Sequence, residues 1–291
     1  MFAQAIEAIL QDQFTPAAVR AIEAGASASP AWNVLADAGY LELLADEEAG
    51  GAALTLADLF PIVAAIGRHA TPVPLAQSIA ARALLAHASR AVPAGMITLA
   101  PSCVRDRDGA LACANVPYGT IADYVIAGHA HGVLLLDGAA ATRTSSGVHR
   151  SQSATLAWPA DYRGDPVAGA TASDVQVWGA ALHAALIAGA AARAAEMTLE
   201  YCQVRAQFGR PIGKYQAIQH QLAVMTEHVA ATTVAAQLAF VGARRQPARH
   251  DGSSPGGVQV SLGSVYGKVS KRSAGPPARR REWCLARGPR V

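Results

Sequence analysis

The chain has 291 residues, of which 52% are hydrophobic, 15% charged and 5% aromatic. This length allows one large domain or two to three small ones, and this apolar content excludes a wholly disordered chain. Residues 1–240 carry 13 Lys and Arg against 19 Asp and Glu, a net charge of −6, whereas residues 241–291 carry 11 against 2, a net charge of +9. Because the body is acidic and only the end is basic, we expect no nucleic-acid partner.

The first third of the chain predicts a helical domain over residues 1–92. Thr55 is followed three residues later by Asp58, which is a short form of the capping box that begins helices. The apolar positions after it repeat at helical spacing as far as Gly67. Two prolines then precede a further helix, predicted over residues 76–88.

The middle of the chain, residues 93–172, predicts an all-β domain. Glycine and proline become frequent there, and short β-rich runs occupy residues 124–126 and 133–136. The glycine-containing stretch between these two runs is typical of a hairpin or a short loop.

Residues 173–248 predict a return to helices. The segment 179–192 is apolar on nearly every side, as expected of a fully buried helix. The most apolar stretch, residues 177–192, is interrupted by His183 and is too short to span a membrane comfortably. A second helix presents a near-heptad seam suited to packing against other helices. This seam consists of Ile218, Leu222, Met225, Val229, Thr232 and Ala236.

Residues 249–291 form a basic low-complexity tail with no apolar periodicity.

The location and metal content of the protein are predicted from its N-terminal segment and its cysteines. The first 13 residues lack the basic flank and apolar run of a signal peptide. Four cysteines lie scattered without metal-ligand spacing. We therefore expect a cytoplasmic protein that binds no metal.

A short segment between the two C-terminal helices carries the functional prediction. One helix ends at Arg205, a loop carries Phe208, and the next helix begins near Gln216. The first N–H groups of a helix are unpaired and lie at its positive end, so they suit an anion such as a pyrophosphate, and a guanidinium suits the same group. Phe208 could pack on a flat aromatic ring. The alternative is a purely structural corner between two helices, with a solvated arginine and a buried phenylalanine.

The same segment closely resembles a signature of the acyl-CoA dehydrogenase family, Arg-x-x-Phe-Gly-x-x-Ile-x-x-x-Gln. Residues 35–39, 47–51, 65–68 and 72–75 resemble that family's N-terminal helical domain, and residues 116–123 resemble the entry to its middle β-domain. The resemblance covers residues from about 30 to 243. It implies a mainly α fold with a central β-barrel-like domain and a partial C-terminal helical bundle.

The resemblance also implies a cofactor, a reaction and partners. The cofactor would be FAD, bound in a homo- or hetero-oligomer, with Arg205 and Gln207 on the diphosphate across a subunit interface. Phe208, Ile212, Tyr215 and Gln216 would pack around the adenine and ribose. The reaction would be α,β-dehydrogenation of an acyl-CoA thioester, with the electrons passing to an electron-transferring flavoprotein.

The chain departs from the family pattern in three places. The flavin-contacting sequence of the middle domain and its tryptophan strand are not recognisable. No carboxylate occupies residues 177–182, one of the two places where the family carries its catalytic glutamate, so the catalytic residue is unknown. The tail 249–291 matches nothing in the family, which suggests a truncated or out-of-frame end. The alternatives to an active dehydrogenase are therefore a non-catalytic partner subunit of a heteromeric enzyme and an inactive truncated product.

Overall fold

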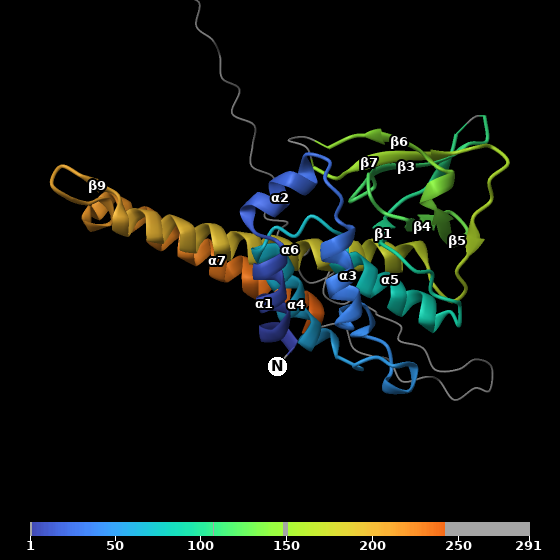
Figure 1. Ribbon diagram of the computed structural model, residues 1–291, viewed down its shortest axis with the longest axis horizontal. Helices are drawn as coiled ribbons and strands as arrows, with labels where there is room; N and C mark the ends of the chain where they lie inside the picture. Colours follow the sequence, from blue (N-terminus) through green and yellow to red (C-terminus); the bar gives the residue numbers. More distant parts are fainter. Residues whose placement is uncertain (1, 107, 148–150, 242–291) are drawn as a thin grey trace, which may run out of the picture.

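The structure is a computed structural model that describes residues 2–106, 108–147 and 151–241. Within these residues the element order is helical, then β, then helical (Figure 1). The predicted division into four segments stays a prediction, and the tail 249–291 lies outside the described residues. The N-terminal helices are α1 (Phe2–Gln13), α2 (Pro16–Glu23), α3 (Ser29–Asp37), α4 (Leu56–Arg68) and α5 (Leu75–His87), with 3-10 turns at Tyr40–Glu42 and Glu47–Ala49.

The start of α4 is fixed by the predicted capping box. The Thr55 side chain accepts a hydrogen bond from the Asp58 backbone N–H, and the Asp58 carboxylate accepts one from the Thr55 backbone N–H. Two of the helix's unpaired donors are satisfied in this way. The helix that follows buries seven residues of one broad face, including Leu59, Ile62 and Ile66.

The β-domain consists, within the described residues, of two four-stranded sheets. The first sheet has the order β1-β4-β5-β8, in which β1 and β4 are parallel and the other pairs are antiparallel; the second has the order β2-β3-β7-β6 and is antiparallel. The predicted runs 124–126 and 133–136 lie in β4 and β5, which pair as an antiparallel hairpin. The strands are β1 (Ile97–Ala100), β2 (Val104–Arg105), β3 (Leu111–Val116), β4 (Tyr124–His129), β5 (Gly132–Asp137), β6 (Thr142–Ser145), β7 (Ala154–Trp158) and β8 (Asp165–Pro166), with a 3-10 turn at Gly138–Ala140.

The first sheet has two buried faces, and successive residues of its strands alternate between them. In β4, Val125 and Ala127 belong to the apolar core shared with the second sheet, whereas Ile126 belongs to the helical core. In β5, Leu136 belongs to the core shared with the second sheet, and Leu135 belongs to the helical core. The β-sandwich is thereby joined to the helices through one continuous apolar layer.

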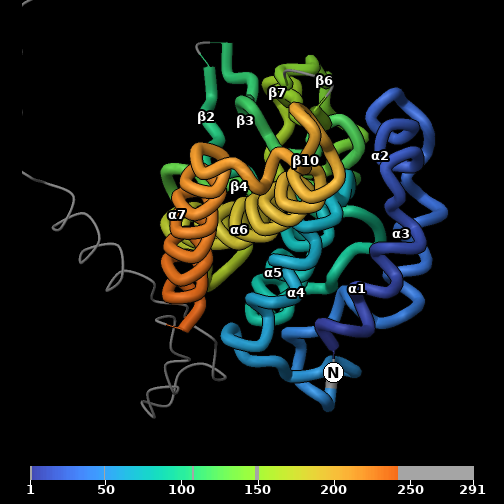
Figure 2. Tube along the Cα trace, turned by 90° about the vertical axis from the view of Figure 1, so that its left-hand side faces the viewer, coloured from blue at the N-terminus to red at the C-terminus, as the bar shows by residue number. Residues whose placement is uncertain are grey.

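Two long helices, α6 (Ala172–Val204) and α7 (Gln216–Val241), follow the β-domain. They run side by side, and their connection forms the free tip of an arm that extends away from the rest of the molecule (Figures 1 and 2). At 33 residues, α6 is roughly 50 Å long. Its first residues pack on β4, its middle crosses α4, and its C-terminal part extends along the arm.

The length of α6 contradicts the prediction that its apolar segment is too short to span a membrane. By length and composition alone, both α6 and α7 are long and apolar enough to cross a membrane, so the prediction that the apolar segment was too short was wrong. Of the apolar window of each helix, 39% is buried in α6 and 11% in α7. Since α6 packs against α4, β4 and α7, it has the surroundings of a core helix. The absence of a membrane partner stays a prediction.

Two glycines allow α4 and α6 to cross at close range. A Cβ atom on Gly67 of α4 would lie 2.1 Å from the Leu186 carbonyl oxygen of α6. A Cβ atom on Gly189 of α6 would lie 1.8 Å from the Ala64 carbonyl oxygen of α4. No side chain can occupy such a gap, so the contact requires glycine on both helices. This crossing sets the position of α6 relative to the N-terminal helices.

Candidate functional site

The segment between α6 and α7 is a tight hairpin. Its strands are β9 (Ala206–Gln207) and β10 (Arg210–Pro211), which pair antiparallel, and a 3-10 turn over Ile212–Lys214 leads into α7. The Ile212 N–H donates to the Arg205 carbonyl oxygen at 2.8 Å and closes the loop. The two residues at the tip, Phe208 and Gly209, have φ values of 52° and 81°. Positive φ at both central residues is the signature of a type I′ turn.

Phe208 sits in a conformation that costs energy and leaves its ring in water. A non-glycine residue with positive φ is disfavoured by about 1–2 kcal/mol, and the Phe208 side chain is 93% exposed. The sequence alternative of a buried phenylalanine at this corner is therefore wrong. A strained backbone that displays a large apolar ring is typical of a functional position.

Tyr215 stabilises the hairpin through its hydroxyl and its ring. Its hydroxyl donates to the Gln207 carbonyl oxygen at 2.8 Å. The Arg210 guanidinium lies over the Tyr215 ring, 4.3 Å from its centre, and the Phe208 ring meets the Tyr215 ring edge to face with centres 6.5 Å apart. These contacts hold the exposed aromatic ring at a fixed place beside the start of α7.

The polar side chains of the corner are available to a ligand. Among the residues the structure describes, the Arg205 guanidinium and the Gln207 and Gln216 amides make no side-chain hydrogen bond or ion pair. The first N–H groups of α7 are free of intrahelical partners, as at any helix start. A guanidinium, amides, a helix start and an exposed aromatic ring fit the diphosphate and adenine of a dinucleotide. Arg205, Gln207, Phe208 and Gln216 are exposed, whereas Ile212 and Tyr215 are half-buried; their contact with FAD stays a prediction.

A cavity of about 400 Å³ lies against the middle of α6, between the helical and β-domains. The end of α4 and the loop after it form one wall, α6 forms the opposite wall, and loops of the β-domain and the end of α2 complete the lining. His183 of the cavity and Arg205 of the corner are 22 residues apart on one helix, a separation of roughly 33 Å. Apolar lining residues include Ile66, Ala70, Pro72, Leu186, Ile187 and Ala190.

Three polar groups of the cavity have hydrogen-bonding capacity to spare. Thr71 is 4% exposed, and its hydroxyl has no partner among the described residues. The Tyr118 hydroxyl lies 3.4 Å from the Thr71 carbonyl oxygen, at the limit of a hydrogen bond, and burial raises the pKa of Tyr118 to about 12. The His183 Nδ1 atom lies 2.7 Å from the Gly179 carbonyl oxygen and must donate to it, which leaves Nε2 as an acceptor in the neutral ring.

The described carboxylates around α6 are committed to structural roles. Asp174 caps the first turn of α6 in a capping box with Thr171. Glu196 pairs with Arg68 of α4 and with Arg193. The Arg68 guanidinium holds the pKa of Glu196 below its usual range. Glu23 is the one carboxylate among the described residues lining the cavity, and it is solvent-exposed.

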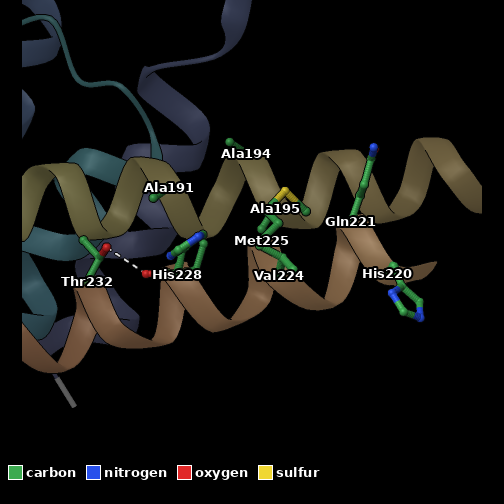
Figure 3. Close-up of a pocket in the computed structure, with 10 residues that line it drawn as sticks. Ala191, Ala194, Ala195, His220, Gln221, Val224, Met225, His228 and Thr232 are labelled. Atoms are coloured by element: carbon green, nitrogen blue, oxygen red, sulfur yellow. Dashed lines mark hydrogen bonds between the residues drawn. The ribbon is translucent and has the colours of Figure 1, made fainter. Parts of the chain in front are cut away.

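A shallow apolar groove of about 600 Å³ runs along the arm between α6 and α7. Figure 3 shows Ala191 and Ala195 on the side of α6 next to α7, with Met225 of α7 reaching toward Ala195. The groove exists because the α6 side chains that line it are small. The seam residues of α7 are therefore only half-buried, except Ala236, which is buried. His220, Gln221, His228 and Thr232 also line the groove, but the surface that it exposes is almost entirely apolar. The groove therefore suits packing with another apolar surface.

Comparison with known proteins decides the family. Models of the acyl-CoA dehydrogenase N-terminal domain and C-terminal domain match residues 1–94 and 172–262. The acyl-CoA dehydrogenase IpdE2 of Mycobacterium tuberculosis is 31% identical over 250 residues, which cover 79% of this chain and 72% of the relative.

The chain belongs to the acyl-CoA dehydrogenase family. Its predicted family and fold class are therefore confirmed.

Solved structures of acyl-CoA dehydrogenases share the fold. The chain is similar to the Tcur3481-Tcur3483 steroid ACAD G363A variant, with 30% identity, a TM-score of 0.67, and coverage of 80% of this chain and 74% of that one. It is also similar to a chain of the ChsE4-ChsE5 complex from Mycobacterium tuberculosis, with 21% identity, a TM-score of 0.69, and coverage of 82% and 76%. The second likeness shows the fold alone.

Proposed function

We propose that this acyl-CoA dehydrogenase chain is one subunit of an FAD-dependent hetero-oligomer that dehydrogenates an acyl-CoA thioester. Its 205–216 corner would bind the diphosphate and adenine of an FAD whose flavin ring lies in a neighbouring subunit. The observation that carries this proposal is the position of the corner at the tip of a free arm. Because the corner lies roughly 22–33 Å along α6 from the α6 residues of the chain's own interdomain cavity, it is placed to serve a site outside its own body.

The corner residues divide between the two ends of the nucleotide. Arg205, Gln207 and the first N–H groups of α7 would hold the diphosphate, since they are donors without other partners. Phe208 would pack against the adenine ring, with Ile212, Tyr215 and Gln216 around the adenine and ribose. The Tyr215 hydrogen bond to the Gln207 carbonyl oxygen keeps these groups in place before the nucleotide arrives.

The chemistry would be shared between subunits. Bound FAD supplies the acceptor for the hydride that leaves the β carbon of the acyl group. The described carboxylates of this chain cap a helix, pair with arginine or face solvent, so we assign removal of the α proton to a carboxylate of the partner. This favours the non-catalytic partner subunit over a self-sufficient enzyme. Electron-transferring flavoprotein as the electron acceptor and a cytoplasmic location are parts of the same proposal.

The apolar surface of the arm supports an oligomer. The two helices that form the groove also carry large hydrophobic side chains that are more than a third exposed. Exposed apolar surface of this extent marks an interaction site in most proteins. Heteromeric assembly is also suggested by the ChsE4-ChsE5 complex among the similar structures. The exposed residues are Ile187, Met197, Leu199, Tyr201 and Val204 of α6, and Val224, Val234, Leu238 and Val241 of α7.

The experiment compares FAD binding by the full chain alone and together with a glutamate-bearing paralogue from the same organism. We expect a flavin spectrum only for the mixture, and we expect Arg205→Ala to weaken FAD binding by at least about tenfold, as for a lost charge-assisted contact. Arg163→Ala is the matched control, because Arg163 is an exposed arginine of the β-domain. FAD binding to the chain alone as a monomer, or unchanged binding after Arg205→Ala, would overturn the proposal.

A further inference from the structure

Two of the cysteines that the structure describes, Cys103 and Cys113, are free thiols in the apolar core between the two sheets of the β-domain. We propose that they form a redox modification site: hydrogen peroxide oxidises Cys103, and a reversible disulfide to Cys113 then joins the edge strand β2 to β3. The site is independent of FAD binding at the 205–216 corner.

The register of β2 and β3 places the two cysteines opposite each other. Val104 pairs with Ala112 in this antiparallel ladder, so the next two residues along it, Cys103 and Cys113, face each other. Side chains at directly opposite positions of an antiparallel pair lie on the same face of the sheet. Both cysteines are buried in the same apolar core, so this face is the inner one.

The alternation of hydrogen bonds along the ladder makes this a close pair. The Asp106 N–H donates to the Ala110 carbonyl oxygen at 2.9 Å, and hydrogen-bonded and non-hydrogen-bonded pairs alternate from there. Cys103 and Cys113 therefore form a non-hydrogen-bonded pair, and the Cys103 N–H donates instead to the Gly128 carbonyl oxygen of β4. The Cα atoms of such a pair are about 4.5 Å apart, within the range of roughly 4.4–6.8 Å that a disulfide spans.

The surroundings of Cys103 favour its thiolate, which is the form that a peroxide oxidises. A hydrogen bond from the Cys113 thiol lowers the pKa of Cys103, burial opposes this effect, and the Arg105 charge adds to it, so the pKa lies below its ordinary value. The same hydrogen bond and burial raise the pKa of Cys113, so Cys103 reacts first. A cysteine of lowered pKa with a second thiol beside it is typical of redox-sensing sites.

Cys103 is buried, but it lies in an exposed segment at the edge of the sheet. Its exposed fraction is 4%, whereas Pro101 and Ser102 before it and Val104 and Arg105 after it are exposed. The strand β2 has two residues and lies at the edge of the second sheet. A short segment with few buried contacts opens locally at a low free-energy cost, and such an opening gives a molecule as small as hydrogen peroxide access to the thiolate.

The oxidation consumes one peroxide and releases two waters. The Cys103 thiolate attacks a peroxide oxygen, the O–O bond breaks, and the departing hydroxide takes up the proton that Cys103 has lost, which leaves Cys103 as a sulfenic acid. The Cys113 sulfur then attacks the Cys103 sulfur, the S–O bond breaks, and the hydroxide leaves with the Cys113 proton as a second water. Exchange with an added thiol restores both cysteines.

The experiment treats the full chain with hydrogen peroxide in a Cys284→Ser background, because Cys284 lies outside the described residues. We expect the mass to fall by two hydrogen atoms, a linked peptide that contains Cys103 and Cys113, and full reversal by dithiothreitol. Cys202 of α6 is also buried and is the internal control, which should keep its thiol. The amides of β2 and β3 should exchange hydrogen at least about tenfold more slowly in the disulfide form, because the cross-link restricts opening.

Single substitutions separate the roles of the two thiols. Cys113→Ala should leave Cys103 as a sulfenic acid that dimedone traps, and Cys113→Ser should give the same adduct, so that the result does not depend on one substitution in the core. Cys103→Ala should leave Cys113 unmodified.

Three outcomes would each refute the dithiol site. They are the absence of a Cys103–Cys113 linked peptide after peroxide treatment, oxidation of Cys202 at the same rate, and a dimedone adduct on Cys113 in the Cys103→Ala chain. All readouts are taken on the chain without FAD, so loss of cofactor binding at the corner would leave them unchanged.

Discussion

The backbone of Gly189 in α6 lies directly against the carbonyl oxygen of Ala64 in α4, where a Cβ atom would approach to 1.8 Å. Both contacting groups are backbone atoms, so a larger side chain could be accommodated only if a whole helix moved. This contact therefore fixes the position at which the arm leaves the body of the protein.

Gly189→Ala should for this reason be strongly destabilising. We expect a loss of more than about 2 kcal/mol, at the upper end for an overpacked core, seen as a lowered midpoint in urea unfolding. Gly179→Ala is the matched control, because Gly179 lies in the same helix and a Cβ there would meet nothing within 4 Å. The control should be neutral or stabilising, by up to about 1 kcal/mol, since alanine favours helices over glycine. Equal effects of the two substitutions would show that the helix crossing is looser than described.

Replacing Phe208 should separate stability from cofactor binding. Phe208→Asn should stabilise the unliganded chain by about 1 kcal/mol, because Asn-Gly is a preferred pair for a type I′ turn. The same change should weaken FAD binding in the assembled protein, because it removes the ring expected to pack on adenine.

Phe208→Ala is the control for that pair of effects. Alanine loses the ring but keeps the disfavoured positive φ, so FAD binding should fall without a gain in stability. Thermal unfolding of the unliganded chain and FAD titration of the assembled protein measure the two quantities. A drop in stability for Phe208→Asn would contradict the strained turn.

The ion pair between Arg68 and Glu196 predicts a modest dependence of stability on pH. Since the pKa of Glu196 is lowered in the folded protein, its contribution is present above the pKa of an unfolded glutamate, about 4.3, and is lost as pH falls through the lowered value. Both side chains are partly exposed, so the contribution at pH 7 should be below about 1 kcal/mol.

Glu196→Gln should accordingly reduce the free energy of unfolding at pH 7 and have little effect near pH 3. Glu200→Gln is the control, because Glu200 lies on the same helix face at the longer distance of 3.9 Å from Arg193. Urea unfolding at the two pH values measures the difference. A destabilisation by Glu196→Gln that persists at low pH would indicate packing rather than charge.

Local signals in the sequence predicted the features that depend on a few neighbouring residues. The Thr55 and Asp58 capping box and the β4–β5 hairpin were confirmed, because both depend on side chains or turns a few residues apart. The location of the corner was predicted from Arg205 and Gln216. Its strained turn was not, although the Phe208-Gly209 pair between two short strands was a signal that could have indicated it.

Contacts between segments that are distant along the chain could not be predicted from the sequence. Glu196 pairs with Arg68, which is 128 residues away, and this ion pair is part of the contact between α4 and α6. The cavity brings Thr71, Tyr118 and His183 together from three domains of the predicted scheme. No local spacing encodes such a meeting, because it results from the packing of the two domains against α6.

The free arm has a consequence for how the protein would keep its cofactor. The nucleotide would be bound partly by the tip of one chain and partly by the body of another. It would therefore be released when the chains separate. Cofactor content would then depend on how much of both chains is present: a concentrated sample would be yellow, and dilution alone would bleach it. Supply of the second polypeptide would in this way set the level of active enzyme.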